Sequence, residues 1–231
     1  MVGRASLSPE EMAKRIDHAV LRPDATFNDL ERGCEEARRY GLRGICVQPW
    51  LVKNACRLLK GSEVRVCAVV GFPFGYTLPE VKAREAECVM ELGAQDVDMV
   101  INVSALKSGM YELVLEELTS VVDVVKEAGG VVKAILEVCY LAEDEVRKAC
   151  ELALRAGVDF VKTSTGFGPS GATVEAVKLM RAVVGDRAGV KASGGIRTFE
   201  QALAMMEAGA DLIGTSTPGP IIEGARRASG S

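Results

Sequence analysis

Histidine is nearly absent from this sequence, since His18 is the single imidazole among 231 residues. Metal sites that depend on several histidines cannot be assembled from it, and it contains neither an HExxH motif nor a cluster of cysteine and histidine. We therefore expect no metal ion at the functional site. We assign no catalytic role to His18, because a lone histidine near the end of a strand is more often a hydrogen-bonded structural group.

Features of membrane, secreted and nucleic-acid-binding proteins are also missing. No apolar run reaches the roughly 18 residues that a membrane-spanning helix needs, and the start MVGRASLSPEEMAKRI lacks the apolar segment of a signal peptide. The 28 basic and 32 acidic residues are spread along the chain, without a basic block, and leave a net charge of −4. We expect a cytoplasmic protein that binds neither nucleic acid nor membranes.

The seven cysteines form no CxxC pair, and their number is odd. This pattern indicates reduced thiols rather than a disulfide framework or a zinc site. Cys46 could reach a functional site, because it lies at the end of a predicted strand. We interpret it either as a small core thiol, which is the more common use of such a residue, or as a pocket residue.

Short apolar runs alternate with longer segments of helical spacing along the whole chain. Strands that alternate with helices pair in parallel through right-handed crossovers. Eight strand-helix units in 231 residues predict an α/β fold, a single (β/α)8 barrel with a short N-terminal helix, and one domain over residues 1–231. The predicted strands begin at Ile16, Gly44, Val64, Asp96, Val131, Val158, Gly189 and Asp211.

Three helix starts carry a capping signal. Ser8, Thr77 and Thr198 each precede a glutamate or glutamine by three residues, which is the spacing of a capping box. Helices are therefore expected to begin directly after these residues, the first of them with Pro9 in its first turn.

Two lysines lie where strands are expected to end. Lys162 in VDFVKTSTGFG and Lys191 in AGVKASGGIRT each follow an apolar run and precede a loop with glycine. In a (β/α)8 barrel this edge carries the reactive groups, and a lysine that loses its proton there is a candidate nucleophile for imine formation. The alternative, that these lysines form buried ion pairs which only close the barrel, stays open from the sequence.

Strand alternation places further charged residues inside the barrel. In the run from Asp96 to Val103, Asp98 lies opposite an apolar face that should contact the helices. Lys133 and Glu137 share one face of the next run and are expected to line the barrel, which makes Lys133 a possible pocket residue. A buried carboxylate needs a partner. Lysines this close repel one another, so we expect the pKa of at least one of them to be lowered.

Glycine-containing loops follow the last three predicted strands, with the sequences TGFGPSGAT, SGGIRT and GTSTPGP. Backbone amides exposed in such loops bind anions when a helix follows, and barrels often bind phosphate at their last loops. Arg197 and Ser216 could add further donors. Ordinary turn chemistry explains any one loop, but three in the expected place favour a ligand that carries phosphate.

Six motifs resemble, in order, those of the deoxyribose-phosphate aldolase family: IDHAVLRPDAT, VVGFPFGYT, VDMVIN, VKTSTGFGPSGAT, VKASGGIRT and GADLIGTS. The resemblance spans nearly the whole chain. It implies a class I aldolase that forms a Schiff base and needs no metal or other cofactor. The implied reaction is the reversible cleavage of 2-deoxy-D-ribose 5-phosphate to D-glyceraldehyde 3-phosphate and acetaldehyde, in deoxyribose phosphate catabolism, and the implied assembly is a homodimer.

The resemblance also implies roles for particular residues. Lys162 would be the Schiff-base lysine, and Asp98 and Lys191 would form the group that donates and accepts protons. Thr163 and Ser164 would contact substrate hydroxyls. The residues that would bind the phosphate are Gly166, Gly194, Gly195, Gly214 and Ser216.

The chain departs from the family pattern in several places. Arg22 stands where a lysine is usual in the first motif, and Val138 stands where a threonine often follows the glutamate of the fifth strand. The last loop, GTSTPGP, lacks the common serine-serine-glycine run, and the sequence ends in ARRASGS without the C-terminal tyrosine of many members. These differences bear on phosphate binding and on the rate of proton transfer, not on the type of reaction.

Two other functions are left open. The chain could be another lysine-dependent lyase that acts on a different phosphosugar. The aldehyde side of the pocket would distinguish the two enzymes. It could also be a non-catalytic phosphosugar-binding barrel, but that function would require Lys162 or Asp98 to be lost or misplaced.

Overall fold

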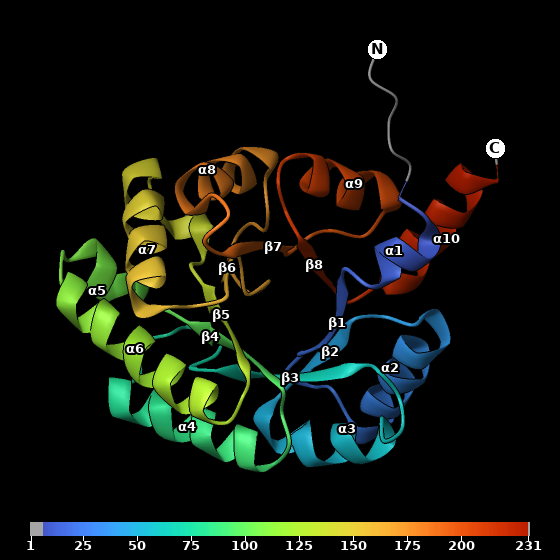
Figure 1. The fold of residues 1–231 in the computed structure, drawn as a ribbon, viewed down its shortest axis with the longest axis horizontal. Helices are drawn as coiled ribbons and strands as arrows, with labels where there is room; N and C mark the ends of the chain where they lie inside the picture. Colours follow the sequence, from blue (N-terminus) through green and yellow to red (C-terminus); the bar gives the residue numbers. More distant parts are fainter. Residues whose placement is uncertain (1–6, 231) are drawn as a thin grey trace.

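The strands of the molecule form one closed, parallel barrel. The computed structural model describes residues 7–230, and residues 1–6 and Ser231 lie outside it. The prediction that the start of the sequence lacks a signal peptide therefore falls partly outside the described residues. Each strand pairs with the next along the chain, and β8 closes the ring against β1. Helices surround the strands (Figure 1). The predicted (β/α)8 barrel with a short N-terminal helix is confirmed.

The strands are short, and a helical segment follows each of them. The strands are β1 (Ile16–Val20), β2 (Gly44–Val47), β3 (Arg65–Val70), β4 (Asp96–Val100), β5 (Val131–Ile135), β6 (Phe160–Lys162), β7 (Gly189–Ser193) and β8 (Leu212–Thr215). The α-helices are α1 (Pro9–Ala13), α2 (Phe27–Tyr40), α3 (Val52–Leu58), α4 (Pro79–Glu91), α5 (Val103–Lys107), α6 (Tyr111–Glu127), α7 (Glu143–Ala156), α8 (Val174–Val184), α9 (Phe199–Glu207) and α10 (Pro218–Ser229). Two 3-10 turns are η1 (Pro49–Leu51) and η2 (Val138–Tyr140). None of the helices in residues 7–230 is long and apolar enough to cross a membrane.

The strand register places charged residues beside one another inside the barrel. Asp98 of β4 pairs with Lys133 of β5, and Lys162 of β6 pairs with Lys191 of β7. Residues that alternate with them, such as Val97, belong to the apolar core under the helices. Each strand therefore has an apolar outer face, and the polar side chains of β4 to β7 meet in the centre.

β4 ends earlier than predicted, because a side-chain hydrogen bond replaces the backbone hydrogen bonds of the sheet. Its last residue is Val100 rather than Val103. Asn102 caps α5 instead, and its side-chain oxygen accepts a hydrogen bond of 3.0 Å from the Ala105 N–H. The strand therefore ends at Val100, and the cap of the next helix follows two residues later.

β5 also ends earlier than predicted, at Ile135. Glu137 has a φ of 54°, in the left-handed region, so the chain turns out of the strand there. Lys133 faces the barrel interior as expected. Glu137 does not share its face, and it lies at the mouth of the barrel instead.

Two of the three predicted capping boxes are confirmed. Ser8 caps α1 and Thr198 caps α9, each with the reciprocal hydrogen bonds of the motif. The prediction for Thr77 is wrong, because α4 begins two residues later, at Pro79, with Leu78 in front of it and no side-chain cap. A proline fits the first helical position without a cap, since it has no N–H to satisfy.

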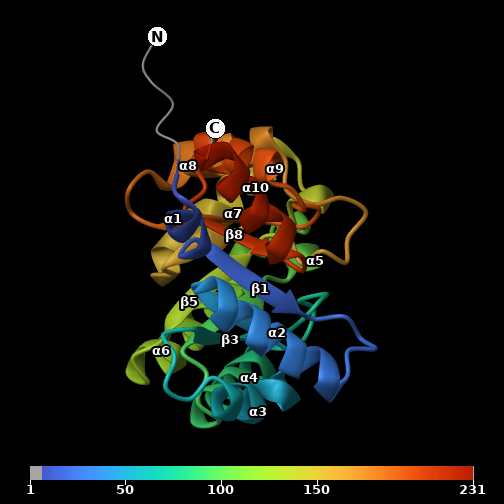
Figure 2. The same cartoon turned by 90° about the vertical axis from the view of Figure 1, so that its right-hand side faces the viewer.

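The short helix α1 packs against the last helix, α10. Figure 2 shows the two side by side, with β1 leading away from α1 into the barrel. The beginning and the end of the described chain are therefore neighbours in the outer layer of helices.

The loop between β3 and α4 approaches the end of β4 so closely that one of its residues must be glycine. Gly75 has a φ of 73°, and a Cβ atom there would lie 2.0 Å from the carbonyl oxygen of Ile101. The Gly75 N–H also donates a hydrogen bond of 2.8 Å to the Gly71 carbonyl. A side chain at Gly75 would both strain the backbone and push the loop away from β4.

We expect Gly75→Ala to lower the free energy of unfolding by about 3–5 kcal/mol, the sum of the left-handed strain and the backbone clash. Urea unfolding at fixed protein concentration measures this loss. Gly109→Ala is the matched control, because Gly109 has the same φ of 73° and a Cβ atom there would have no neighbouring atom within 4 Å. It should lose only about 1–2 kcal/mol; equal losses in the two variants would contradict the close approach.

Candidate active site

A carboxylate with three lysines around it lies at the centre of the barrel. The Nζ atoms of Lys162 and Lys191 each lie 2.8 Å from Asp98 Oδ2, and Lys133 Nζ lies 2.8 Å from Asp98 Oδ1. All four side chains are buried. The structure thus brings together the three residues predicted to be catalytic and places Lys133 beside them.

Two further carboxylates balance this cluster. Lys191 Nζ lies 2.6 Å from Asp17 Oδ2, and Lys133 Nζ lies 2.8 Å from Asp96 Oδ2. Arg43, just before β2, bridges the two acids, at 2.9 Å from Asp17 and 2.7 Å from Asp96. The barrel interior therefore holds a continuous network of alternating charges, with each buried charge paired.

The network sets the direction of the pKa shifts. Burial alone would raise the pKa of Asp98, but the ammonium groups around it outweigh burial and hold that pKa well below its usual range. Burial alone would lower the pKa of Lys133 and Lys191, but neighbouring carboxylates raise both: above all Asp98 for Lys133, and Asp17 followed by Asp98 for Lys191. Our expectation of a lowered lysine pKa is wrong for these two residues, because attraction to the acids exceeds repulsion between the lysines.

Two thiols complete the surroundings of Asp98. Cys67 of β3 donates a hydrogen bond of 3.0 Å to Asp98 Oδ1, and its sulfur lies 3.6 Å from that of Cys46 in β2. The two sulfur atoms and an Asp98 oxygen lie close enough to share a metal ion. A cation at that point would face the ammonium groups that already bind Asp98, so the charge pattern favours these thiols as packing groups.

A cavity of about 280 Å³ opens above the charge network, at the carboxyl ends of the strands, and we call it the main cavity. Lys162 and Lys191 line it, whereas Asp98 and Lys133 lie beneath it. Cys46 lines it as well, so the structure supports the pocket interpretation of this thiol. The other predicted site residues that line it are Gly166, Gly194, Gly195, Arg197, Gly214 and Ser216.

Thr163 and Ser164 are not where a substrate contact requires them. Both are fully buried, and neither lines the main cavity. The Thr163 hydroxyl donates to the Ser193 carbonyl at 3.0 Å, which ties the end of β6 to β7. Thr165, further along the same loop, lines the cavity instead.

The loops after β6 and β7 pack directly on each other. A Cβ atom at Gly171 would lie 2.1 Å from the carbonyl oxygen of Gly194, so only glycine fits this contact. The Ala172 N–H also donates to the Ser193 carbonyl at 3.0 Å. The contact fixes the backbone of Gly194 and Gly195 at one end of the main cavity, where backbone donors suit an anion.

Cationic groups surround this end of the cavity at its surface. Arg197 and Arg22 both line the cavity and are exposed. Arg22 is paired with Asp24, its Nη2 at 2.5 Å from Oδ2. The outer end therefore offers glycine backbone, the Ser216 hydroxyl and guanidinium groups, while Lys162 lies at the inner end.

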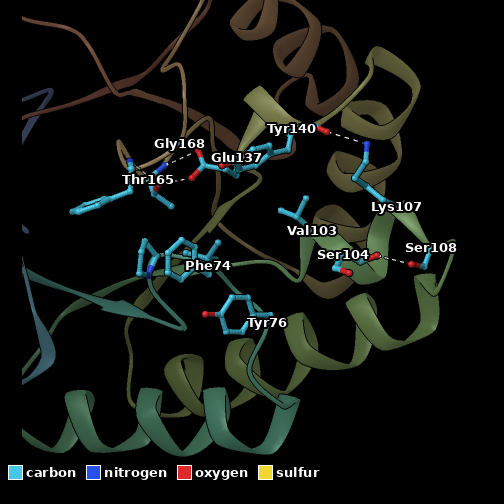
Figure 3. Close-up of a pocket in the computed structure, with 13 residues that line it drawn as sticks. Phe74, Tyr76, Val103, Ser104, Lys107, Ser108, Glu137, Tyr140, Thr165 and Gly168 are labelled. Atoms are coloured by element: carbon cyan, nitrogen blue, oxygen red, sulfur yellow. Dashed lines mark hydrogen bonds between the residues drawn. The ribbon is translucent and has the colours of Figure 1, made fainter.

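A second cavity, of about 520 Å³, adjoins the main cavity and shares Thr165 and Phe167 with it. Glu137 lies in its wall, where it accepts hydrogen bonds from the backbone N–H and the hydroxyl of Thr165 (Figure 3). Glu137 thus holds the loop after β6 and does not join the lysine cluster. The other aromatic side chains of this cavity are Phe74, Tyr76 and Tyr140.

His18 lies on the outer side of β1, away from the charge network. Its ring interacts with the backbone of Gly33 and Ser216, and its Nδ1 atom, 3.6 Å from Glu36, has no hydrogen-bond partner among the described residues. Burial, the largest influence, lowers the pKa of His18 to about 4. The imidazole is therefore neutral at pH 7, in a packing position.

Sequence reasoning missed Asp17, Asp96 and Arg43. Alternation contained a signal for Asp96, which lies two residues before Asp98 on the same face of β4. No local pattern indicates Arg43, because it lies outside the strand and finds its partners across the floor of the barrel. Its role depends on the closure of the ring.

Comparisons with known proteins agree with this geometry. A family model described as DeoC/LacD family aldolase matches residues 11–225. The deoxyribose-phosphate aldolase of Thermococcus gammatolerans is 56% identical over 220 residues, which are 94% of this chain and 98% of that protein. Among solved structures, an aldolase called QR15 has a TM-score of 0.90 at 42% identity, with 95% of this chain and 97% of that chain covered. A tetrameric deoxyribose phosphate aldolase from Aeropyrum pernix has a TM-score of 0.88 at 37% identity, with 94% and 91% covered.

We expect the buried His18 to make stability depend on pH. The pKa falls from 6.5 in the unfolded chain to about 4 in the folded one, so between these values only the unfolded state binds the proton. The stability contributed by neutral His18 is complete above pH 6.5 and is lost as the pH falls toward 4, by about 3 kcal/mol. Urea unfolding from pH 7 to pH 4 of the wild type and of His18→Gln measures the difference.

The same pair of measurements in a Glu36→Gln background controls for the neighbouring carboxyl, whose pKa burial raises. An identical pH dependence with and without His18 would show that the imidazole is not neutral by burial.

Proposed function

Since the chain belongs to the DeoC/LacD family of aldolases, we propose that its main cavity is a deoxyribose-phosphate aldolase site in which Lys162 forms the Schiff base. The reaction is the reversible cleavage of 2-deoxy-D-ribose 5-phosphate to D-glyceraldehyde 3-phosphate and acetaldehyde. The observation that carries the proposal is the position of Lys162 at the inner end of the cavity, 2.8 Å from Asp98 Oδ2.

The division of work between the two cavity lysines follows from their partners. Lys191 contacts two carboxylates, Asp17 and Asp98, which raise its pKa and keep it protonated. Within residues 7–230, Lys162 forms an ion pair with Asp98 alone, through the oxygen that Lys191 also contacts. Only a neutral amine attacks an aldehyde. Lys162 is therefore the nucleophile, and Lys191 is the cation beside it.

The chemistry follows from an imine on Lys162. The amine adds to the C1 aldehyde of the open sugar, and loss of water gives a protonated imine. The C3 hydroxyl then loses its proton, the C2–C3 bond breaks, and its electron pair forms an enamine while C3 becomes the aldehyde of the released phosphosugar. The enamine gains a proton on carbon, and water releases acetaldehyde. The imine cation accepts the electrons, so no free carbanion forms.

Protons reach the reacting atoms through Lys191. Asp98 does not line the cavity, but its Oδ2 atom lies 2.8 Å from both Lys162 and Lys191. It takes a proton only in passing, because its pKa is held well below the usual range. Asp98 thus connects the two amines, and Lys191 presents the proton to the cavity.

The two ends of the main cavity suit the two halves of the substrate. Near Lys162 the lining includes the small apolar side chains of Ala19, Leu21 and Cys46, which suit a two-carbon aldehyde. The opposite end has the glycine loops with Arg197 and Ser216, which suit a phosphate. The arrangement supports Gly166, Gly194, Gly195 and Gly214 as phosphate contacts, and it gives no support to Thr163 and Ser164 as hydroxyl contacts.

The other two functions have less support. A non-catalytic barrel would not need a lysine and a carboxylate placed at 2.8 Å in a cavity. Another lysine-dependent phosphosugar lyase would have to fit its own aldehyde into the cavity that Leu21 and Cys46 line with Lys162.

We also propose a homodimer that works in the cytoplasm, built from one domain over residues 1–231. Exposed aromatic side chains support an association surface, since Phe74 and Tyr76 stack on each other and are 60% and 67% exposed. The Aeropyrum pernix relative is described as a tetramer, so its assembly is larger.

Incubation with acetaldehyde followed by borohydride reduction should attach an ethyl group to Lys162. Peptide mapping by mass spectrometry locates the adduct. Lys162→Leu should abolish the modification, while Lys148→Leu, at an exposed helix position, should leave it unchanged. An adduct on Lys191 in the wild type, or an unmodified Lys162 during turnover, would overturn the assignment of the nucleophile.

Lys191→Leu and Asp98→Asn should each lower kcat for deoxyribose phosphate cleavage by about 10²–10⁴-fold, because each interrupts the proton path. Both steady-state kinetics and circular dichroism are needed, since Asp98→Asn also removes a charge from the buried network. A folded variant of either kind that turns over at the wild-type rate would exclude that residue from proton transfer.

A further inference from the structure

Among residues 7–230, four lysine side chains are buried, and one of them is far from the main cavity. Lys82 belongs to α4, on the outside of the barrel, and is fully buried. Its Nζ atom lies 2.6 Å from Glu117 Oε2, and Glu117 of α6 is also fully buried. α4 and α6 run side by side in Figure 1. This buried ion pair has no part in the mechanism described above.

The pair continues the hydrogen bonding of β4 beyond the end of the sheet. β3 and β4 pair only as far as Val70 and Met99. Lys82 Nζ donates a hydrogen bond of 2.8 Å to the next carbonyl, that of Val100, and so stands in for a strand N–H group. Glu117 Oε1 accepts a hydrogen bond of 2.6 Å from the backbone N–H of Asn102. Two polar backbone groups at the strand end are thus held by side chains.

α4 holds the end of β3 as well. Glu85 Oε2 accepts a hydrogen bond of 2.8 Å from the Gly71 N–H, one residue past β3. The aliphatic stem of Lys82 lies under the same glycine, where a Cβ atom would be 2.9 Å from Lys82 Cε. β3 and β4 carry the Cys67 thiol and the Asp98 carboxylate that meet inside the barrel.

The pair is costly to bury, which argues for a purpose beyond stability. Burial lowers the pKa of Lys82 and raises that of Glu117, so each charged form is opposed by its surroundings. Replacement of such a pair by apolar groups of similar size is often neutral for stability. Here the replacement would also leave the Val100 carbonyl and the Asn102 N–H without partners, next to the strand that carries Asp98.

We propose that Lys82 and Glu117 are positioning residues for the aldolase reaction: they fix the carboxyl end of β4 and thereby the contact of Asp98 with Lys162 and Lys191. Val100 is two residues beyond Asp98, so a shift of the strand end moves the carboxylate on which both cavity lysines depend. This inference rests on the proposed function, because it assigns to the pair an effect on Asp98 in that reaction.

The test compares Glu117→Leu and the double variant Lys82→Met/Glu117→Leu with Glu117→Gln. Leucine removes the acceptor for the Asn102 N–H, whereas glutamine keeps an oxygen there. Rates are expressed per active site, counted by borohydride trapping of acetaldehyde. We expect kcat to fall about 10–100-fold in the leucine variants, as for a displacement of about 1 Å, with KM within about twofold. Glu117→Gln should keep kcat within about threefold of the wild type.

The exposed pair Arg84 and Glu87 on the same helix provides the control, since both alanine substitutions should leave kcat unchanged. A role in stability alone would lower Tm and leave kcat per active site intact in the leucine variants, which would overturn the proposal. Failure of both leucine variants to fold would also overturn it, since the pair would then serve folding only.

Hydrogen exchange separates this inference from the proposed function. Amides of residues 98–102 should exchange faster in the double variant than in the wild type, whether or not the wild type cleaves deoxyribose phosphate. Unchanged exchange would refute the proposal that Lys82 and Glu117 fix the end of β4. An inactive wild type with accelerated exchange in the variant would refute the proposed function. It would still support the role of Lys82 and Glu117 in fixing the end of β4.

Discussion

The carboxylate of Asp98 is the group on which the rest of the site depends. Three ammonium groups lie 2.8 Å from its two oxygens, and it is the carboxylate that all three of them share. Coulomb repulsion among three buried cations is large in a medium that screens poorly. The acid gives each of these cations an opposite neighbour, so that Lys162 can be held at the buried end of the cavity.

This network can exist only in a closed ring of strands. Its members come from β1, β4, β5, β6 and β7, and the contact between Lys191 and Asp17 joins residues 174 positions apart. An open sheet would leave β1 and β8 at opposite edges, and Asp17 would then be lost to Lys191. Parallel pairing places Asp98 beside Lys133 and Lys162 beside Lys191, and the proposed catalytic contacts among them need the closed barrel.

Period-two alternation was enough to predict that Asp98 faces inward and that Lys162 and Lys191 lie at strand ends, since both depend on local chain geometry. The directions of the lysine pKa shifts were not predictable, because Asp17 and Asp96 reach Lys191 and Lys133 across the ring. The ends of strands were also predicted wrongly, since a hydrogen bond to a side chain such as that of Asn102 competes with the backbone hydrogen bonds between strands. Thr163 and Ser164 were expected in the cavity from the family resemblance, which does not show how deeply each side chain is buried.

The charge balance of the network also constrains the reaction. In the proposed mechanism, a protonated imine on Lys162 would carry the same single positive charge as the ammonium form of that lysine, so Asp98 would keep three cationic partners. The enamine is uncharged, and Asp98 then retains only Lys133 and Lys191 as cationic partners. Asp98 would thus favour return of a proton to the enamine, since that step would restore its third cationic partner. In the proposed mechanism, the attraction of Asp98 for a third cation would therefore favour protonation of the enamine and so the release of the aldehyde.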